Sequence, residues 1–229
     1  MSDPRLEPSV FHSRWYHLKA LRAALEEEFR GAVGERARGG ILVDLGCGSM
    51  PYREIFEPLV GRYVGIDLAG NERAALHFDQ FGRAPIEDGS VDVVLSSQVL
   101  EHVPSPQAYL EEAHRILKPD GLLFLSTHGY WMFHPDPTDY WRWTAAGLRT
   151  EVERAGFFVE HMRGVMNLAA SGVQLFQDGV AGGVPAPARP AFFWLMNRIM
   201  ALADTAGDAE RRNVDACVYV VRAARRQRD

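Results

Sequence analysis

The sequence predicts an α/β fold in which a mostly parallel sheet carries helices on both faces. Short apolar segments rich in β-branched residues alternate with longer amphipathic segments, as they do in βαβ units. A glycine turn directly follows the apolar segment 41–45, and the next apolar segment, 63–68, also contains an acidic residue near its end. Open α/β sheets bind ligands at the carboxyl ends of their strands, so both features predict a ligand site at that edge.

The first expected element is an amphipathic helix over residues 9–30. Apolar residues recur within it at helical spacing, at Leu18, Leu21, Leu25 and Phe29. Near its start, Tyr16 and its aromatic neighbours leave two interpretations open. They either pack on the domain surface or cover a bound cofactor, in which case Tyr16 would contact the substrate.

The segment 41–49 is expected to be a buried strand that runs into a tight turn. Asp44 interrupts the apolar run just before the turn, and a buried acid is costly unless it has a partner. Gly46 and Gly48 permit positive φ and a close approach of the backbone to a ligand. A dinucleotide site would need a third glycine where Pro51 stands, so the turn favours a different nucleoside-type cofactor.

The following elements continue the alternation. Asp67 lies about twenty residues beyond the glycine turn, where a carboxylate can accept hydrogen bonds from ribose hydroxyls. The expected helices cover residues 51–58, 105–117 and 145–155. The expected strands cover residues 63–68, 91–96 and 122–126, with a turn at 118–121 before the last of them.

Composition excludes several classes of function. The chain has 229 residues with 47% hydrophobic and 24% charged content, which is ordinary for a globular protein. A net charge of −5 gives no general attraction to nucleic acid, and we expect no nucleic-acid partner. Two cysteines, no signal pattern and no apolar run of membrane-spanning length predict a cytoplasmic protein without stable membrane insertion. The basic residues near the end are expected to form a solvated tail: Arg222, Arg225, Arg226 and Arg228.

Five motifs occur in an order that resembles the class I S-adenosylmethionine (SAM) dependent methyltransferases of the type 11 group. They are VDLGCGS at 43–49, VGID at 64–67, PIEDGSVD at 85–92, LEHVP at 100–104 and LKPDG at 117–121. The resemblance covers roughly residues 40–160. It implies a three-layer, Rossmann-like sheet of seven strands, with the last strands at about 157–165 and 214–221, and SAM as the cofactor.

The resemblance also implies roles for individual residues. The glycines would pass under the methionine and ribose parts of SAM, Asp44 would orient the turn near the amino group, and Asp67 would bind the ribose. Either Asp79 or Gln80 would reach the adenine, and three residues after the fourth strand would flank the sulfonium. His102, one of those three, could equally be a packed residue at a helix start. The expected cofactor-binding set is Asp44, Gly46, Cys47, Gly48, Asp67, Leu68, Asp79, Gln80, Ser97, Gln98 and His102.

The aromatic segment 126–144 is expected to bind the substrate, because a simple connection would be more polar. His128 or His134 is predicted to act as general base, with Asp139 orienting the imidazole. A structural alternative is an ion pair between Asp139 and Arg142. A metal held by His134, Asp136 and Asp139 is allowed by residue type, but no spacing secures its geometry and no metal is expected. The expected substrate-binding residues are Tyr16, Trp131, Tyr140 and Arg142.

The chain is expected to form a single domain with four parts. Residues 1–35 would be a helical cap, 36–165 the SAM-binding core, 166–213 a helical insert or lid, and 214–229 the final strand and basic tail. Within the insert, the apolar segment 191–203 predicts a buried helix that roofs the site. Contact within a homodimer, or docking to a lipid-linked acceptor, is the alternative for this helix.

The predicted function is SAM-dependent methyl transfer to a small molecule or glycan, with O-methylation favoured. The pattern of His134, Pro137, Asp139, Tyr140 and Arg142 resembles a subset of the group linked with surface-glycan or secondary-metabolite biosynthesis. N- or C-methylation of a small molecule and non-catalytic SAM binding remain open alternatives. An enzyme that methylates the amino groups of nucleic-acid bases would carry an Asn/Asp-Pro-Pro-Tyr/Phe signature, which this chain lacks.

Overall fold

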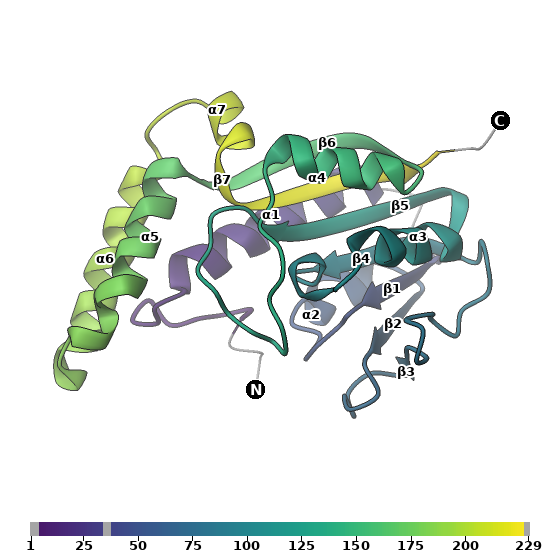
Figure 1. The fold of residues 1–229 in the computed structure, drawn as a ribbon, viewed down its shortest axis with the longest axis horizontal. Coiled ribbons are helices and arrows are strands. Elements are labelled where there is room, and N and C mark those ends of the chain that lie inside the picture. The colour runs from purple at the N-terminus through teal and green to yellow at the C-terminus, as the bar shows by residue number, and fades with distance from the viewer. Residues whose placement is uncertain (1–4, 34–37, 227–229) are drawn as a thin grey trace.

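A seven-stranded mixed sheet with helices on both faces forms the centre of the computed structural model, which describes residues 5–33 and 38–226 (Figure 1). The strand order is β3-β2-β1-β4-β5-β7-β6. The pairings from β3 through β5 are parallel, and β7 is antiparallel to both of its neighbours. The strands are β1 Ile41–Leu45, β2 Arg62–Asp67, β3 Leu76–His77, β4 Val91–Ser97, β5 Leu117–His128, β6 Phe157–Asn167 and β7 Ala216–Arg225. The predicted α/β class with a mostly parallel sheet is confirmed.

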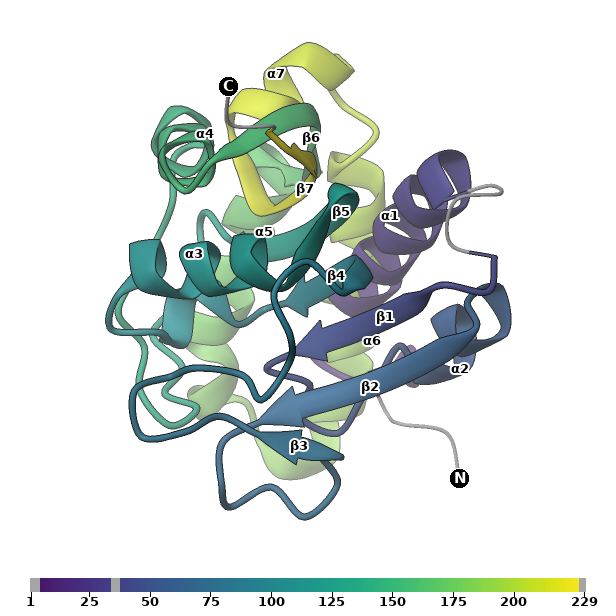
Figure 2. The ribbon, with the colours of Figure 1, turned by 90° about the vertical axis from the view of Figure 1, so that its right-hand side faces the viewer.

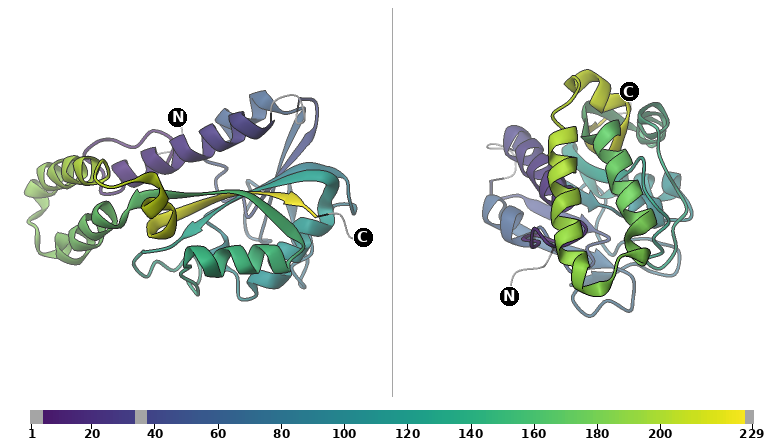
Figure 3. Two further views of the ribbon diagram at one scale, coloured as in Figure 1. Left: turned by 90° about the horizontal axis from the view of Figure 1, so that it is seen from above. Right: turned by 90° about the vertical axis from the view of Figure 1, so that its left-hand side faces the viewer.

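Two hydrophobic cores lie on opposite faces of this sheet. Alternate strand residues point to opposite faces, so Leu42 belongs to the core under α1 and α2, while Val43 belongs to the core under α3 and α4. Figures 2 and 3 show α1 and α4 on opposite sides of the strands. The helices are α1 Trp15–Val33, α2 Arg53–Phe56, α3 Pro106–Ile116, α4 Ala145–Arg154, α5 Leu168–Val180, α6 Arg189–Ala203 and α7 Ala209–Val214.

Several element boundaries differ from the sequence prediction. The first helix begins at Trp15 and not at residue 9, and α2 covers only four residues of the expected 51–58. The expected turn at 118–121 lies within β5, at an irregularity in its pairing with β4. Lys118 binds Asp92 of β4 there, with 2.7 Å between Nζ and Oδ1, which holds the two strands together.

The predicted basic tail is largely part of the sheet. Arg222 and Arg225 lie in β7, which extends four residues beyond the expected end at 221. Arg222 pairs with Glu28 of α1 at 3.2 Å and with Glu160 of β6 at 3.1 Å, so its charge serves packing between elements. Arg228 lies outside the described residues.

The apolar helix expected at 191–203 forms, but the prediction that it is buried is wrong. Within α6, Met196, Asn197 and Met200 are buried, and the large side chains on its other face are exposed. They are Trp194, Leu195, Ile199 and Leu202. The reason is visible in Figures 1 and 3: α6 packs beside α5 in a hairpin that projects from the end of the sheet, so only one stripe of α6 meets protein. No helix in the described ranges is both long and apolar enough to cross a membrane.

Polar contacts attach the α5–α6 hairpin to the segment that precedes α1. The Asn197 side chain donates hydrogen bonds to the carbonyls of Val10 and His12, both at 3.0 Å, and its oxygen accepts the Tyr16 amide at 3.4 Å. Gln177 of α5 donates to the Ser13 carbonyl at 2.9 Å. The hairpin and the start of α1 are therefore held as one unit beside the carboxyl end of β5.

We predict that Asn197→Ala destabilises the protein by about 1–3 kcal/mol, because the fully buried Asn197 side chain and its three hydrogen bonds are lost. Leu202→Ala on the same helix is the matched control and should change stability by no more than about 0.5 kcal/mol, since this side chain is exposed. Urea denaturation measures both values. Equal losses in the two variants would show that Asn197 does not anchor the hairpin.

Candidate active site

The glycine turn lies at the carboxyl end of β1, against the end of β2. Gly46 and Cys47 both donate backbone hydrogen bonds to the Ile66 carbonyl, at 2.8 and 3.0 Å. Gly46 has a φ of +77°, and a Cβ at this position would lie 2.6 Å from a methyl carbon of Val99. Positive φ and the close approach of Val99 together require glycine here.

Asp67, at the end of β2, organises the second half of the turn. Its carboxylate accepts hydrogen bonds from the amides of Gly48 and Leu68, both at 2.8 Å, and from the side chain of Asn71 at 2.7 Å. The Asn71 side chain also donates to the Gly48 carbonyl at 2.7 Å. Sequence reasoning did not identify Asn71. The Leu68 side chain is exposed, so its amide is what contributes to the turn.

Asp44 is buried under the turn and accepts a short hydrogen bond from the Tyr63 hydroxyl. Burial raises the pKa of Asp44 to about 7, and the neighbouring Asp67 acts in the same direction, while the Tyr63 hydrogen bond opposes them. Burial also raises the pKa of the Cys47 thiol to about 12, so this cysteine stays protonated and serves as packing.

Ser97 and Gln98 connect the ends of β4 and β5. The Gln98 amide donates to the Ser126 carbonyl at 2.8 Å, and the Ser97 and Ser126 hydroxyls are 3.0 Å apart. Gln98 has a φ of +58°, which turns the chain sharply after β4. Its side-chain oxygen is buried and lacks a hydrogen-bond partner among the described residues.

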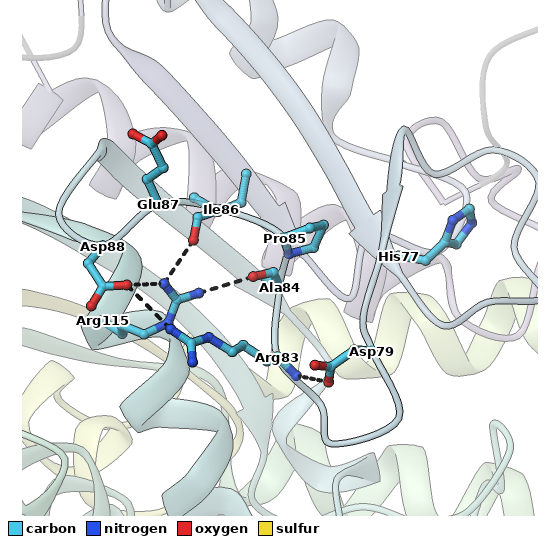
Figure 4. Close-up of a pocket in the computed structure, with 9 residues that line it drawn as sticks. All are labelled: His77, Asp79, Arg83, Ala84, Pro85, Ile86, Glu87, Asp88 and Arg115. Atoms are coloured by element: carbon cyan, nitrogen blue, oxygen red, sulfur yellow. Dashed lines mark hydrogen bonds and ion pairs between the residues drawn. The ribbon is translucent and has the colours of Figure 1, made fainter.

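Asp79 and Gln80 lie on an exposed turn after β3. The Asp79 carboxylate accepts hydrogen bonds from the Phe81 and Arg83 amides, at 2.8 and 2.9 Å, so it shapes its own turn. The same segment borders an open pocket of about 550 Å³, shown in Figure 4. Arg115 crosses that pocket and donates to the carbonyls of Ile86 and Ala84, which makes its role there structural.

Three histidines have ring contacts with Trp131 near the carboxyl ends of β4 and β5, and a fourth contacts one of these three. We call His17, His102, His128 and His134 the histidine cluster. His128 stacks on Trp131 with ring centres 4.7 Å apart and planes 8° from parallel, and His17 lies 4.4 Å from the same indole. His134 meets His128 at 4.8 Å and His102 at 4.9 Å. The sequence predicted three of these histidines as site residues. His17, on α1, was expected only as a packing or lid residue.

The buried carboxylate at this site is Glu101, which sequence reasoning did not select. It lies in the LEHVP motif and is fully buried. The Thr127 hydroxyl donates to Oε2 at 2.8 Å, and Oε1 lies 3.5 Å from Nε2 of His128. Burial raises the pKa of Glu101 to about 7. An acidic residue directly after the apolar Val99 and Leu100 was the available signal, since burial of a charge needs a reason.

The aromatic segment is held in place mainly by Asp139 and Arg142. The Arg142 guanidinium donates to both oxygens of Asp139, at 2.7 and 2.6 Å, and to the Trp131 carbonyl at 3.0 Å. Burial would raise the pKa of Asp139, but hydrogen bonds from Arg142 and from the His134 amide lower it to about 2. These contacts fit the structural alternative from the sequence analysis, in which Asp139 and Arg142 form an ion pair.

Asp139 also approaches the imidazole of His134, with 3.3 Å between Oδ2 and Nδ1. Burial lowers the pKa values of both His134 and His128 below the usual range, so both rings are neutral near neutral pH. A neutral imidazole offers a lone pair on one nitrogen, either to a proton or to a metal.

The two predicted tyrosine contacts lie in different environments. The Tyr16 hydroxyl donates to Asp204 after α6, at 2.9 Å, so it connects α1 with the hairpin. The Tyr140 side chain is about half exposed, while its amide donates to the Glu101 carbonyl at 2.8 Å. Of this pair, Tyr140 therefore has the ring available to a ligand.

Residues 14–162, which include the glycine turn and the histidine cluster, match the family model described as a methyltransferase domain. The chain belongs to the class I SAM-dependent methyltransferases of the type 11 group. It is 28% identical over 150 residues to a probable S-adenosylmethionine-dependent methyltransferase of Mycolicibacterium smegmatis, covering 59% of this chain and 58% of that protein. It is 39% identical over 115 residues to a ubiquinone biosynthesis O-methyltransferase of Ruegeria pomeroyi, covering 44% and 46%. The methyltransferase chain thus spans about half the length of these relatives.

Solved structures share the fold of this methyltransferase. A methyltransferase of Haloferax volcanii, in complex with its activator Trm112, covers 95% of each chain with a TM-score of 0.58 and 20% identity. The cyclase SpnF covers 96% of this chain and 85% of its own with a TM-score of 0.59 and 19% identity. At these identities the likeness shows the fold.

We propose that Asp44 faces the amino group of SAM, and we predict that SAM affinity rises with pH. Below the pKa of about 7 the carboxyl is mostly protonated, so it cannot pair with the cationic amine. Affinity should rise about fivefold from pH 6 to 7.5 and fall above about pH 8, where an α-amino group loses its proton. Calorimetry across this range measures the profile.

Two variants make this prediction specific. Asp44→Asn should abolish the rise, because the amide does not titrate. Tyr63→Phe should move the rise to higher pH, because it removes the hydrogen bond that lowers the pKa of Asp44. A flat profile in the unmodified protein between pH 6 and 7.5 would contradict the assignment.

Proposed function

We propose that this protein transfers the methyl group of SAM to a hydroxyl of a small-molecule or glycan acceptor. The observation that carries the proposal is the histidine cluster beside the ends of β4 and β5, at the same edge of the sheet as the glycine turn. O-methylation differs from methylation of a neutral amine in that a hydroxyl proton must leave, and neutral imidazoles can receive it.

When bound, SAM supplies a methyl group activated by its sulfonium. The residues of this chain then have three tasks. Asp67 and the glycine turn bind and orient the cofactor, and Trp131 with the packed histidines excludes water from the acceptor. His128 or His134 accepts the hydroxyl proton as the acceptor oxygen attacks. The Asp139 carboxylate holds His134 in position through contacts with the backbone amide and the imidazole ring of His134.

Several observations support the choice of acceptor class. One relative is named as an O-methyltransferase of ubiquinone biosynthesis, and the aromatic segment resembles enzymes of glycan and secondary-metabolite pathways. The net charge of −5 disfavours nucleic acid as substrate.

We also infer a cytoplasmic location. The exposed apolar face of α6 is compatible with a homodimer.

Calorimetric titration with SAM and S-adenosylhomocysteine tests the cofactor part of the proposal. We expect both to bind at one site per chain, and Asp67→Ala should weaken both because the turn loses three hydrogen bonds. If neither compound binds to the folded protein, the proposed function is wrong. Binding without methyl transfer to any hydroxyl acceptor would favour N- or C-methylation, or non-catalytic SAM binding.

We predict that His128→Ala and His134→Ala lower turnover by about 10²–10⁴-fold, the usual contribution of a general base. The dissociation constant of SAM should stay nearly unchanged, because neither ring contacts the glycine turn. His161→Ala, on the half-exposed surface of β6, is the control and should keep full activity. If both site variants keep normal turnover, the cluster does not take part in the reaction.

A further inference from the structure

Three candidate metal ligands converge within the histidine cluster. Glu101, His102 and His134 each offer one ligand atom, and these atoms lie within 4.8 Å of one another. Glu101 and His102 come from the short helix after β4, and His134 comes from the aromatic segment. Ligands about 2.1 Å from a tetrahedrally coordinated ion lie about 3.4 Å apart, so the ligand atoms would approach one another by up to about 1.4 Å to close the site.

The two histidines are already oriented as metal ligands usually are. Nδ1 of His102 is 2.7 Å from the Thr138 carbonyl, and Nδ1 of His134 is 3.3 Å from both the Met132 carbonyl and the Asp139 carboxylate. Donation from Nδ1 fixes the tautomer that leaves the lone pair on Nε2. His102 therefore has Nε2 available. Nδ1 of His134 also lies 3.5 Å from the Arg142 guanidinium, but the Met132 carbonyl and the Asp139 carboxylate are closer and favour the same tautomer.

Glu101 supplies an independent observation. It is fully buried, and its Oε1 atom lacks a hydrogen-bond partner among the described residues. The His128 ring nitrogen at 3.5 Å is beyond hydrogen-bond length. An ionised carboxylate in this position needs a counter-charge. The nearby Arg142 makes no hydrogen bond to Glu101 in the described part of the chain, and its terminal nitrogens are engaged by Asp139.

We propose that Glu101, His102 and His134 form a site for one divalent transition-metal ion. Two imidazole nitrogens and one carboxylate oxygen suit zinc, manganese or ferrous iron better than magnesium or calcium, which prefer all-oxygen sites. Three protein ligands leave positions open for water or for an acceptor oxygen. The set differs from the one considered from the sequence: Asp136 is exposed and Asp139 is paired with Arg142.

The catalytic consequence, unlike the binding itself, rests on the proposed function. An acceptor hydroxyl bound in an open position would be polarised by the ion, which acts as a Lewis acid. His134 would then be a ligand, and His128 would be the remaining histidine of the predicted pair available to the hydroxyl proton. Loss of His134 would thus impair both metal binding and turnover, whereas loss of His128 would impair turnover.

Metal titration of the full chain, stripped of metal and free of any histidine tag, tests the site without SAM or acceptor. We expect one equivalent of Zn²⁺ by calorimetry, and Co²⁺ should give a visible absorption spectrum. Glu101→Gln and His134→Ala should each weaken the binding of Zn²⁺ by at least about 10–100-fold, which is the loss in metal affinity that removal of an outer-shell partner causes. Asp136→Ala and His161→Ala are matched controls and should bind as the unmodified protein does.

Because Glu101 is buried, circular dichroism must show that each variant is folded. His134→Ala, on the partly exposed aromatic segment, is the second variant and tests the site independently of Glu101. Absence of stoichiometric binding, or equal binding by folded His134→Ala, would overturn the metal site. Methyl transfer that persists in thoroughly chelated protein would overturn its catalytic role and leave the proposed function standing. Metal binding without methyl transfer would leave the site standing and remove the proposed function.

Discussion

The parallel pairing of β1, β2, β4 and β5 is the constraint on which the rest of the site depends. It brings four carboxyl ends to one edge of the sheet, so that the glycine turn, Asp67, Gln98 and His128 lie on neighbouring strands. Backbone amides just beyond the strand ends donate hydrogen bonds to carbonyls of the adjacent strand. Gly46 donates to Ile66, and Gln98 donates to Ser126. The antiparallel β7 fills the gap between β5 and β6, and β6 then carries the chain into the α5–α6 hairpin.

Glu101 is the second residue on which the site depends, because it connects the segment after β4 with β5 and with the aromatic segment. Its carboxylate binds Thr127 of β5, and its carbonyl accepts amides of Tyr140 and Trp141, at 2.8 and 3.3 Å. Together with the Asp139–Arg142 ion pair, these bonds fix an aromatic segment that would otherwise be free to move. The neutral histidines, the unpaired Glu101 oxygen and the Trp131 ring are therefore arranged before any ligand arrives, as preorganised sites require.

The fold alone does not decide the chemistry. The cyclase SpnF and the Haloferax volcanii methyltransferase share this architecture at 20% identity or below. In this chain, three segments gather beside the carboxyl ends of the strands. They are the aromatic segment after β5, the start of α1 with His17, and the hairpin that Asn197 and Gln177 attach to it.

Much of the architecture follows from the sequence alone. Strand and helix alternation, the glycine turn and the acid after the second strand depend on local periodicity and on backbone requirements, and these are visible in the order of residues. The exposure of α6 was not predictable, because an apolar helix shows its buried stripe only when its neighbours are placed. The same holds for Asn71, whose partners are Gly48 and Asp67.

The sequence by itself determined the sheet class, the family and the location of the glycine turn, because short motifs with fixed spacing encode them. Only the tertiary structure decided which polar residues meet. Glu101, His17 and His134 are separated by dozens of positions, and no spacing rule relates a helix near the start of the chain to a segment after β5. Their encounter results from the parallel sheet edge and from the loop that Arg142 holds, so it became visible only with the strands in place.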